Sequence, residues 1–331
     1  MQGHSYLRPL TIGDVTAENN LILGPMAGVT DMSFRVLCRE QGAGLVCAEM
    51  VSAKAVVYRN KRTAALCVTS DSEHPVSLQL FGSDPGVMAE AAAIMNSEYS
   101  FDIMDINMGC PVHKIVSNGE GSALMKDPAL IERIVRAVAE TAGHPVTVKI
   151  RKGFSASDNN AAECARAAEA GGASMIAVHG RTREQFYSGK ADWSVIREVK
   201  NAVSIPVAGS GDVRDGESFV SMMEQTGCDA VMIARAAEGN PWVFREIREY
   251  LETGRTPERP GRDEMTGMLL RHAGMLIADK GEYIGIREMR KHAAWYTRGY
   301  TGAVKLRDKL SKIETMEELT ESVKTFDSEG Q

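Results

Sequence analysis

The chain has 331 residues, of which 44% are hydrophobic and 25% charged, ordinary values for a globular protein with a sizeable core. A net charge of −6 does not favour a general nucleic-acid binder, and no stretch is apolar and long enough to predict a membrane span. The six cysteines are scattered, without a Cys-x-x-Cys pair or Cys/His ligand spacing, which argues against a disulfide framework and a metal site. We therefore expect a cytoplasmic protein with no membrane anchor and no metal.

Short apolar segments alternate with amphipathic, helix-like segments along the first part of the chain. The apolar segments predict buried strands, and the segments between them have helical spacing, as in residues 128–142 and 160–170. Strands joined by helices indicate a parallel sheet that is covered on both faces. Eight strands are expected, at residues 21–26, 44–51, 76–81, 101–106, 146–150, 175–179, 205–208 and 229–234.

Eight strand–helix repeats in about 235 residues match the size of an α/β protein of the (β/α)8 TIM-barrel class. The alternative is an open, doubly wound sheet, but no Gly-x-Gly-x-x-Gly motif follows the first strand. The barrel domain is assigned to residues 1–250, and residues 251–261, rich in Gly, Pro and charge, are typical of a linker. Residues 262–331 predict a small C-terminal helical-bundle domain, with helices at 262–279, 282–300, 303–312 and 315–325.

A loop with a cysteine follows the fourth predicted strand. Gly109 and Pro111 end that strand, so Cys110 stands at its C-terminal end, on a loop, near Asn107 and Lys114. A free cysteine is more often a small buried side chain, and this alternative stays open for Cys110 taken alone. Because barrels carry their active sites where the strands end, the position favours chemistry at the thiol.

Polar and glycine residues follow most of the other predicted strands. Taken singly, each has an ordinary explanation, such as a solvated strand end, but their shared placement predicts one site at the barrel mouth. The turns after the last two strands, at residues 209–212 and 234–235, lie where barrels commonly hold a phosphate. A phosphate there, with Lys149 placed to stabilise an anionic reduced flavin, suits FMN. The strand-end residues are Gln79, Asn107, Lys149, Arg151, His179, Arg181, Gly209, Ser210, Gly211, Asp212, Ala234 and Arg235.

A basic run begins in the second predicted C-terminal helix. Positions 287, 291 and 295 lie at helical spacing and combine cations with an aromatic ring, which would suit RNA. A solvated basic helix whose Trp295 packs inward is the alternative. The cations between residues 285 and 312 are Arg287, Arg290, Lys291, Arg298, Lys305, Arg307, Lys309 and Lys312, against Glu288 and Asp308.

Several motifs connect the chain to a known family. Residues 107–114 (NMGCPVHK) resemble the signature of the tRNA-dihydrouridine synthases, and residues 25–31 (PMAGVTD) resemble that family's opening motif. Similar segments at 178–193, 239–242 and 287–292 extend the resemblance over nearly the whole chain. The last of these segments is most similar to the bacterial B-type subfamily.

The resemblance implies an FMN-binding barrel whose helical domain helps to hold tRNA. It implies Cys110 as the catalytic proton donor, with Asn107 and His179 near the uracil. The cofactor-binding residues that it implies are Pro25, Met26, Ala27, Gln79, Lys149, His179, Gly209, Ser210, Gly211, Asp212, Ala234 and Arg235. The implied contacts to uracil and tRNA are Asn107, Lys114, Arg151, Arg181, Arg287, Arg290, Lys291 and Arg298.

The implied reaction is reduction of the C5=C6 bond of specific D-loop uridines in tRNA by FMN that NADPH has reduced. A thiol with an ordinary pKa of about 8.5 is mostly protonated at neutral pH, so Cys110 can give its proton to C5. The target base must leave its stack, because no duplex fits inside a barrel. A monomer is expected, and the sequence leaves open which uridine is modified.

Two other functions remain open at this stage. One is an FMN-dependent TIM-barrel oxidoreductase that acts on a free small molecule, such as a pyrimidine or an enone. The other is a non-catalytic RNA-binding protein on the same scaffold. The first leaves the basic C-terminal helix without a role, and the second leaves the strand-end residues without one.

Two residues depart from the family's pattern. Ser210 stands where the family usually has Asn, and Ala234 stands where it usually has Gly before Arg235. Ser210 keeps a hydroxyl group that can form a hydrogen bond. The methyl group of Ala234 lies where the backbone would approach the ligand, so we expect FMN to bind more loosely than in other members.

Overall fold

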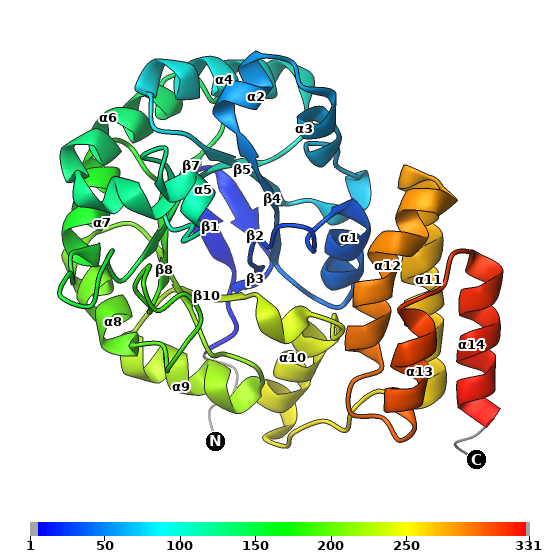
Figure 1. Ribbon diagram of the computed structural model, residues 1–331. Coiled ribbons are helices and arrows are strands. Elements are labelled where there is room, and N and C mark those ends of the chain that lie inside the picture. The colour runs from blue at the N-terminus through cyan, green and yellow to red at the C-terminus, as the bar shows by residue number, and fades with distance from the viewer. Residues whose placement is uncertain (1–5, 329–331) are drawn as a thin grey trace.

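The computed structural model describes residues 6–328, which form a barrel and a helical bundle packed side by side (Figure 1). Parallel strands close the barrel in the order β10-β3-β4-β5-β6-β7-β8-β9, which confirms the predicted TIM barrel. The strands are β3 (Leu21–Leu23), β4 (Leu45–Ser52), β5 (Val76–Phe81), β6 (Ile103–Asn107), β7 (Val146–Arg151), β8 (Met175–His179), β9 (Val207–Ser210) and β10 (Ala230–Ile233). No helix among the described residues is long and apolar enough to span a membrane.

Helices form the outer layer of the barrel (Figure 1). Several begin after an Asp that caps the first turn, as Asp127 does by accepting a hydrogen bond of 2.9 Å from the backbone N–H of Leu130. The helices are α1 (Met32–Glu40), α2 (Ala53–Val57), α3 (Lys61–Leu66), α4 (Pro85–Glu98), α5 (His113–Val116), α6 (Pro128–Ala139), α7 (Ala161–Ala170), α8 (Trp193–Ala202), α9 (Gly216–Thr226) and α10 (Val243–Thr253). Short 3-10 helices are η2 (Asp71–Glu73), η3 (Gly121–Lys126) and η4 (Arg235–Ala237).

Most strand boundaries differ from the expectation by one to three residues, and proline explains two of these differences. Strand β3 ends at Leu23, so that Pro25 and Met26 belong to the following loop. Strand β9 starts at Val207, directly after Pro206, and continues to Ser210. Proline has no N–H group for a strand ladder, and it therefore marks an end of each strand.

A short hairpin that the sequence analysis missed closes one end of the barrel. Strands β1 (Leu10–Ile12) and β2 (Val15–Ala17) pair antiparallel. Their buried side chains pack against the first residues of the barrel strands, such as Ile22 and Leu45. Strands of three residues are too short to show a period of two. The hairpin fills the barrel floor, so the opposite end, where the strands finish, is left for ligands.

Four helices at the C-terminus pack into a bundle beside α1 and α10 (Figure 1). They are α11 (Arg262–Lys280), α12 (Glu282–Tyr296), α13 (Ala303–Leu310) and α14 (Met316–Ser328), which confirms the predicted helical bundle. Helix α12 ends four residues before the predicted end, at a turn in which Gly299 has a φ of +89°. Helix α10 continues to Thr253 and thus occupies the start of the predicted linker 251–261.

The bundle is fixed to the barrel by buried contacts and ion pairs. Trp242, just before α10, is 2% exposed and lies in the core of the bundle, where its ring meets that of Tyr296 edge-on at 5.9 Å. Arg271 on α11 pairs with Glu40 at the end of α1, with 2.5 Å between Nη1 and Oε2. These contacts hold the basic helix α12 at a fixed place next to the barrel mouth.

Candidate active site

The C-terminal ends of the barrel strands surround a cavity of about 1280 Å³. This is larger than the roughly 300–1,000 Å³ of a typical ligand pocket, which leaves room for a cofactor and a second ligand. Most of the predicted site residues line it: Pro25, Met26, Ala27, Gln79, Asn107, Cys110, Lys149, Arg151, His179, Arg181, Ser210, Gly211, Asp212, Ala234 and Arg235. Gly209 and Lys114 do not line it, and neither do the predicted cations of the bundle.

A buried carboxylate that the sequence analysis did not assign lies beneath the cavity. Asp105 on β6 is 3% exposed, and each of its oxygens accepts a hydrogen bond of 2.5 Å, one from Nε2 of Gln79 and one from Oγ1 of Thr147. Burial raises the pKa of Asp105 to about 6, although these hydrogen bonds and the nearby Lys149 ammonium oppose the rise. Asp105 therefore fixes the orientation of the Gln79 amide.

The Gln79 amide in turn positions the cysteine loop. Its Oε1 accepts a hydrogen bond of 2.8 Å from Nδ2 of Asn107. The Oδ1 of Asn107 accepts from the backbone N–H groups of Gly109 at 3.1 Å and Cys110 at 2.9 Å. A continuous hydrogen-bonded chain thus runs from Asp105 to the backbone of Cys110. Most of the hydrogen-bonding groups of the Asn107 side chain therefore hold the loop. One N–H of its amide is left for a ligand.

Cys110 lies at the edge of the cavity and is 8% exposed. Burial raises the pKa of its thiol, while the Arg151 and Lys149 charges oppose the rise. The thiol is therefore protonated at neutral pH. Gly121 has a φ of +59°, and a Cβ there would lie 2.9 Å from the Cys110 carbonyl oxygen, so glycine lets the chain pass directly under the cysteine.

Lys149 and His179 face the cavity from neighbouring strands. Burial lowers the pKa of Lys149 to about 8, with a further contribution from Arg151. Burial and four nearby cations, Lys149 among them, lower the pKa of His179 to about 2, so this ring is neutral. Within the described residues, the Lys149 ammonium has no hydrogen-bond partner. Its charge is therefore available to a ligand in the cavity.

Arg151 was predicted to contact substrate, and it lines the cavity, but its Nε and Nη1 groups bond inside the protein. Its Nε donates to the Gly109 carbonyl at 2.7 Å, and its Nη1 donates to the carbonyls of Thr182 and Phe186 at 2.9 Å each. These bonds join the cysteine loop to the loop after β8. Arg151 therefore positions Cys110 and also supplies positive charge near its sulfur.

Arg181 was also expected to contact substrate, and it too is occupied. It is 2% exposed and its Nη2 donates to both carboxylate oxygens of Asp212 at 2.8 Å. Asp212 also accepts from Arg235 at 3.4 Å and from the Ala191 N–H at 2.7 Å. Although burial alone would raise the pKa of Asp212, the Ala191 hydrogen bond and the Arg181 guanidinium lower it. Asp212 therefore orients two arginines at the cavity.

The glycine within β9 and the glycine directly after it have different roles. A Cβ on Gly209 would lie 2.6 Å from the Met222 sulfur, so Gly209 allows α9 to pack on the barrel, and it does not line the cavity. Gly211 has a φ of +120°, and a Cβ there would lie 2.7 Å from that of Ala191. Ser210 and Ala234 line the cavity. Ala234 has a φ of −123°, outside the left-handed region that favours glycine.

Two adjacent aromatic residues at the cavity rim were not assigned from the sequence. Phe186 and Tyr187 are 44% and 49% exposed and line the cavity. The Arg235 guanidinium lies over the Tyr187 ring at 4.8 Å. Exposed aromatic rings at the mouth of a cavity offer stacking surfaces for a base. The sequence signal that could have indicated this role is a pair of adjacent aromatic residues in a loop that contains glycine.

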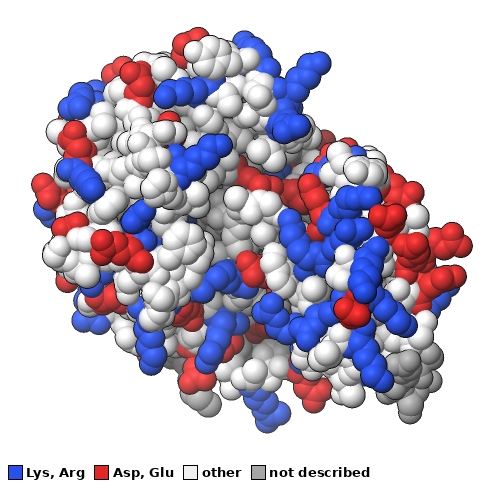
Figure 2. Space-filling model, viewed as in Figure 1, with Lys and Arg blue, Asp and Glu red and all other residues white. Residues whose placement is uncertain are grey.

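Some of the predicted tRNA-binding cations donate hydrogen bonds within the protein, and others are exposed to solvent. Arg287 and Arg290 donate to the carbonyls of Tyr283 and Ile313, at 2.9 and 2.8 Å, and Lys291 donates to the Gly28 carbonyl beside the cavity. Arg298 and Lys114 are exposed. Figure 2 shows Lys and Arg side chains gathered over α12 and α13, beside the hollow at the barrel mouth. The exposed members of this basic surface are Arg298, Lys305, Lys309 and Lys312.

Solved structures with a similar fold are oxidoreductases by their titles. A histamine dehydrogenase from Rhizobium sp. matches with a TM-score of 0.59 and 15% identity, covering 82% of this chain and 51% of that one. A morphinone reductase matches with a TM-score of 0.53 and 13% identity, covering 78% of this chain and 94% of that one. At such low identity these matches show the barrel fold.

Similarity in sequence is much closer to one family. Residues 22–329 match the family model described as dihydrouridine synthase (Dus). The tRNA-dihydrouridine synthase B of Pseudomonas putida is 42% identical over 318 residues, which cover 96% of this chain and 94% of the relative. That of Vibrio parahaemolyticus is 40% identical, covering 92% and 94%. With the cysteine loop in place at the barrel mouth, the chain belongs to the dihydrouridine synthase family.

Proposed function

We propose that this protein is a tRNA-dihydrouridine synthase that reduces the C5=C6 bond of uridines in the D-loop of tRNA, with FMN as cofactor and NADPH as electron donor. The observation that carries the proposal is the protonated Cys110 thiol at the edge of a cavity that Lys149 also lines. The family match and the relatives named tRNA-dihydrouridine synthase B support uridine in tRNA as the substrate. We also propose that the reaction takes place in the cytoplasm and that the enzyme is a monomer.

The residues of the cavity fit FMN. The unpartnered Lys149 ammonium can face the flavin ring, and Arg235 can pair with the phosphate. The turn at Gly211, which lines the cavity and whose φ of +120° favours glycine, can offer backbone N–H groups to the phosphate. When bound, FMN supplies the hydride that adds to C6 of the uracil. We assign its other contacts to Pro25, Met26, Ala27, Gln79, His179, Ser210 and Ala234.

Cys110 completes the reaction by giving its proton to C5. The raised pKa keeps the proton on Sγ until the base is in place. The thiolate that remains lies near the positive charges of Arg151 and Lys149, both of which lower the thiol pKa and so stabilise the anion. Asn107 and Arg151 hold the loop on both sides of the cysteine, so the thiol is positioned before the substrate arrives.

The uracil must reach the cavity as a flipped or single-stranded base. Phe186 and Tyr187 at the rim offer rings on which it can stack. The tRNA body then lies across the exposed cations of the basic surface, which would bind its phosphates. We therefore propose other main phosphate contacts than the predicted Arg287, Arg290 and Lys291. They are Arg298, Lys305, Lys309 and Lys312.

Incubation of the purified protein with FMN, NADPH and tRNA that lacks only dihydrouridine tests the proposal. Mass spectrometry of nuclease fragments should show a gain of two hydrogens at uridines of the D-loop. A protein that binds FMN and oxidises NADPH, yet leaves the tRNA unchanged and reduces a free pyrimidine or enone, would instead be a small-molecule oxidoreductase. A protein that binds tRNA without any flavin chemistry would be a non-catalytic RNA-binding protein.

A further inference from the structure

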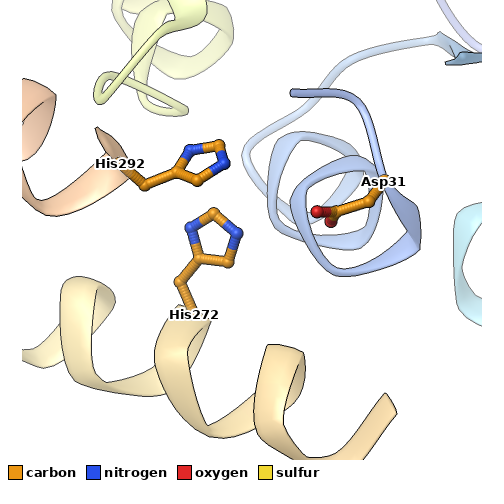
Figure 3. Close-up of side chains that lie close together, drawn as sticks. All are labelled: Asp31, His272 and His292. Carbon is orange, nitrogen blue, oxygen red and sulfur yellow. The ribbon is translucent and has the colours of Figure 1, made fainter. Parts of the chain in front are cut away.

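Three side chains with metal-ligating atoms meet where the barrel joins the bundle (Figure 3). Asp31 caps the start of α1, His272 lies on α11 and His292 lies on α12. Both histidines are 0% exposed and Asp31 is 6% exposed. One ligand atom of each residue lies within 4.8 Å of the others. The cluster lies outside the cavity described above, and the proposed reaction does not use it.

The histidines lack the hydrogen bonds that buried ring nitrogens need. Within the part of the chain that the structure describes, Nε2 of His272 and both ring nitrogens of His292 have no partner. The remaining nitrogen, Nδ1 of His272, lies 3.3 Å from the hydroxyl of Tyr296. A buried polar group without a partner costs about 1–3 kcal/mol, and such groups are rare in folded proteins. Figure 3 shows an edge of each ring turned toward Asp31.

We propose that Asp31, His272 and His292 bind a divalent transition-metal ion, most favourably Zn²⁺. Two imidazoles and one carboxylate are ligands that zinc accepts, with a water molecule in the fourth position. Ligand atoms around tetrahedral zinc lie roughly 3.3 Å apart, as bonds of about 2.0–2.1 Å require. The ligand atoms lie within 4.8 Å of one another, so the cluster must contract by up to about 1.5 Å to reach that spacing. The metal would bind one unpartnered nitrogen of each ring and join the barrel to both helices.

The surroundings of the cluster are compatible with a cation. The ring nitrogens that have no partner can each present a lone pair to a metal ion when the ring is neutral. Two cations lie nearby. Lys280 Nζ lies 3.3 Å from Oδ2 of Asp31 but closer, at 2.7 Å, to Oε2 of Glu288, and Lys291 donates to the Gly28 carbonyl. Lys280 is therefore already paired, and Asp31 keeps lone pairs for a metal.

Sequence spacing could not predict this site. Its ligands come from three separate elements, and Asp31 precedes the histidines by more than 200 positions. The expectation that the protein has no metal was based on cysteine spacing, which does not bear on a site made of histidine and carboxylate.

Titration of the full-length, untagged, FMN-loaded protein with Co²⁺ and then Zn²⁺ tests the proposal. We expect the protein to bind about one Co²⁺ per chain, with ligand-field absorption at longer wavelength than the flavin bands. Zn²⁺ should displace the Co²⁺, and either metal should raise the melting temperature. His292→Gln removes a direct ligand of the metal. It should therefore weaken metal binding by more than the roughly 10–100-fold that results from loss of a residue that only contacts a ligand. Asp31→Asn should also weaken it, while asparagine still caps α1. His144→Gln, at a half-buried histidine of the barrel, is the matched control and should bind like the wild type.

The wild-type titration decides the question even if a variant fails to fold. Absence of Co²⁺ absorption in the folded wild type, with no change in melting temperature, would overturn the proposal and leave ordered water as the partner of the rings. Equal binding by the wild type and the folded His292→Gln variant would also overturn it, because the metal would then lie elsewhere. Neither result depends on dihydrouridine formation, so this test is separate from that of the proposed function.

Discussion

Asp105 influences the site through other residues, since it does not itself line the cavity. In Asp105→Asn, an NH2 group replaces one carboxylate oxygen and faces the donor of either Gln79 or Thr147. We expect the free energy of unfolding to fall by about 1–3 kcal/mol and flavin affinity to fall as well, because Gln79 loses its orientation. Urea denaturation and fluorescence titration with FMN measure the two effects.

Thr147→Val is the matched control for that variant. It removes a hydrogen bond to the same carboxylate but leaves the bond between Asp105 and Gln79 in place. We expect a comparable loss of stability with unchanged affinity for FMN. If both variants bind flavin equally well, Asp105 does not orient Gln79 for the cofactor.

The raised pKa of Cys110 predicts how the reaction depends on pH. Because burial disfavours the thiolate, the proton donor persists to higher pH than an ordinary thiol, whose pKa is about 8.5. The rate at which the reduced enzyme converts tRNA in a single turnover should therefore show no loss through Cys110 below about pH 8.5, and a decline near pH 8 is assigned to Lys149, whose pKa is about 8. A rate that already declines between about pH 6 and 7, with flavin and tRNA still bound, would contradict the role of Cys110.

At the scale of elements, the turn beneath the cysteine can be tested with two glycines. Gly119 and Gly121 both have positive φ, at +76° and +59°, so an alanine at either costs about 1–2 kcal/mol of backbone strain. Only at Gly121 would the new Cβ meet the Cys110 carbonyl, at 2.9 Å, whereas at Gly119 nothing lies within 4 Å. We expect Gly121→Ala to lose product formation and Gly119→Ala to keep most of it. Similar activity in both would show that the loop tolerates displacement.

The basic surface over α12 and α13 predicts a pattern in tRNA affinity. Arg298→Glu and Lys305→Glu should each weaken tRNA binding and reduce the slope of log K against log salt by about 1, because each lost phosphate contact releases one counterion fewer. Arg133→Glu on α6, across the barrel from the bundle in Figure 1, is the control. Filter binding at several salt concentrations measures the affinity for tRNA. Equal affinity of all three variants would exclude this surface as the tRNA-binding site.

Lys291 illustrates how packing changes the role of a surface cation. Its position on a basic helix predicted a phosphate contact, but its ammonium donates to the Gly28 carbonyl. Glu49 on β4 accepts from the N–H of the same glycine, so the loop that lines the cavity is held from both sides. Helical periodicity shows which residues share a face, but not which neighbouring element that face meets.

For the whole molecule, the predictable features are those that repeat locally. Alternation of apolar and amphipathic segments predicts the barrel strands, and strand ends predict the cavity residues, because a parallel barrel brings all strand ends together. The hairpin β1–β2 was missed because three-residue strands have no measurable period. Asp105, the role of Gly209 and the cluster at Asp31 depend on contacts between distant segments, which no local pattern encodes.

The central claim is that Cys110 protonates the uracil, and one comparison tests it most directly. Wild type, Cys110→Ala and Cys164→Ala are each loaded with FMN, reduced, and mixed once with tRNA that lacks dihydrouridine. Cys164 is a fully buried cysteine on α7 that does not line the cavity, so its variant controls for loss of a thiol. We predict a gain of two hydrogens at D-loop uridines with wild type and Cys164→Ala, and little or none with Cys110→Ala although it binds flavin and tRNA. Product formation by Cys110→Ala at the wild-type rate would contradict the account.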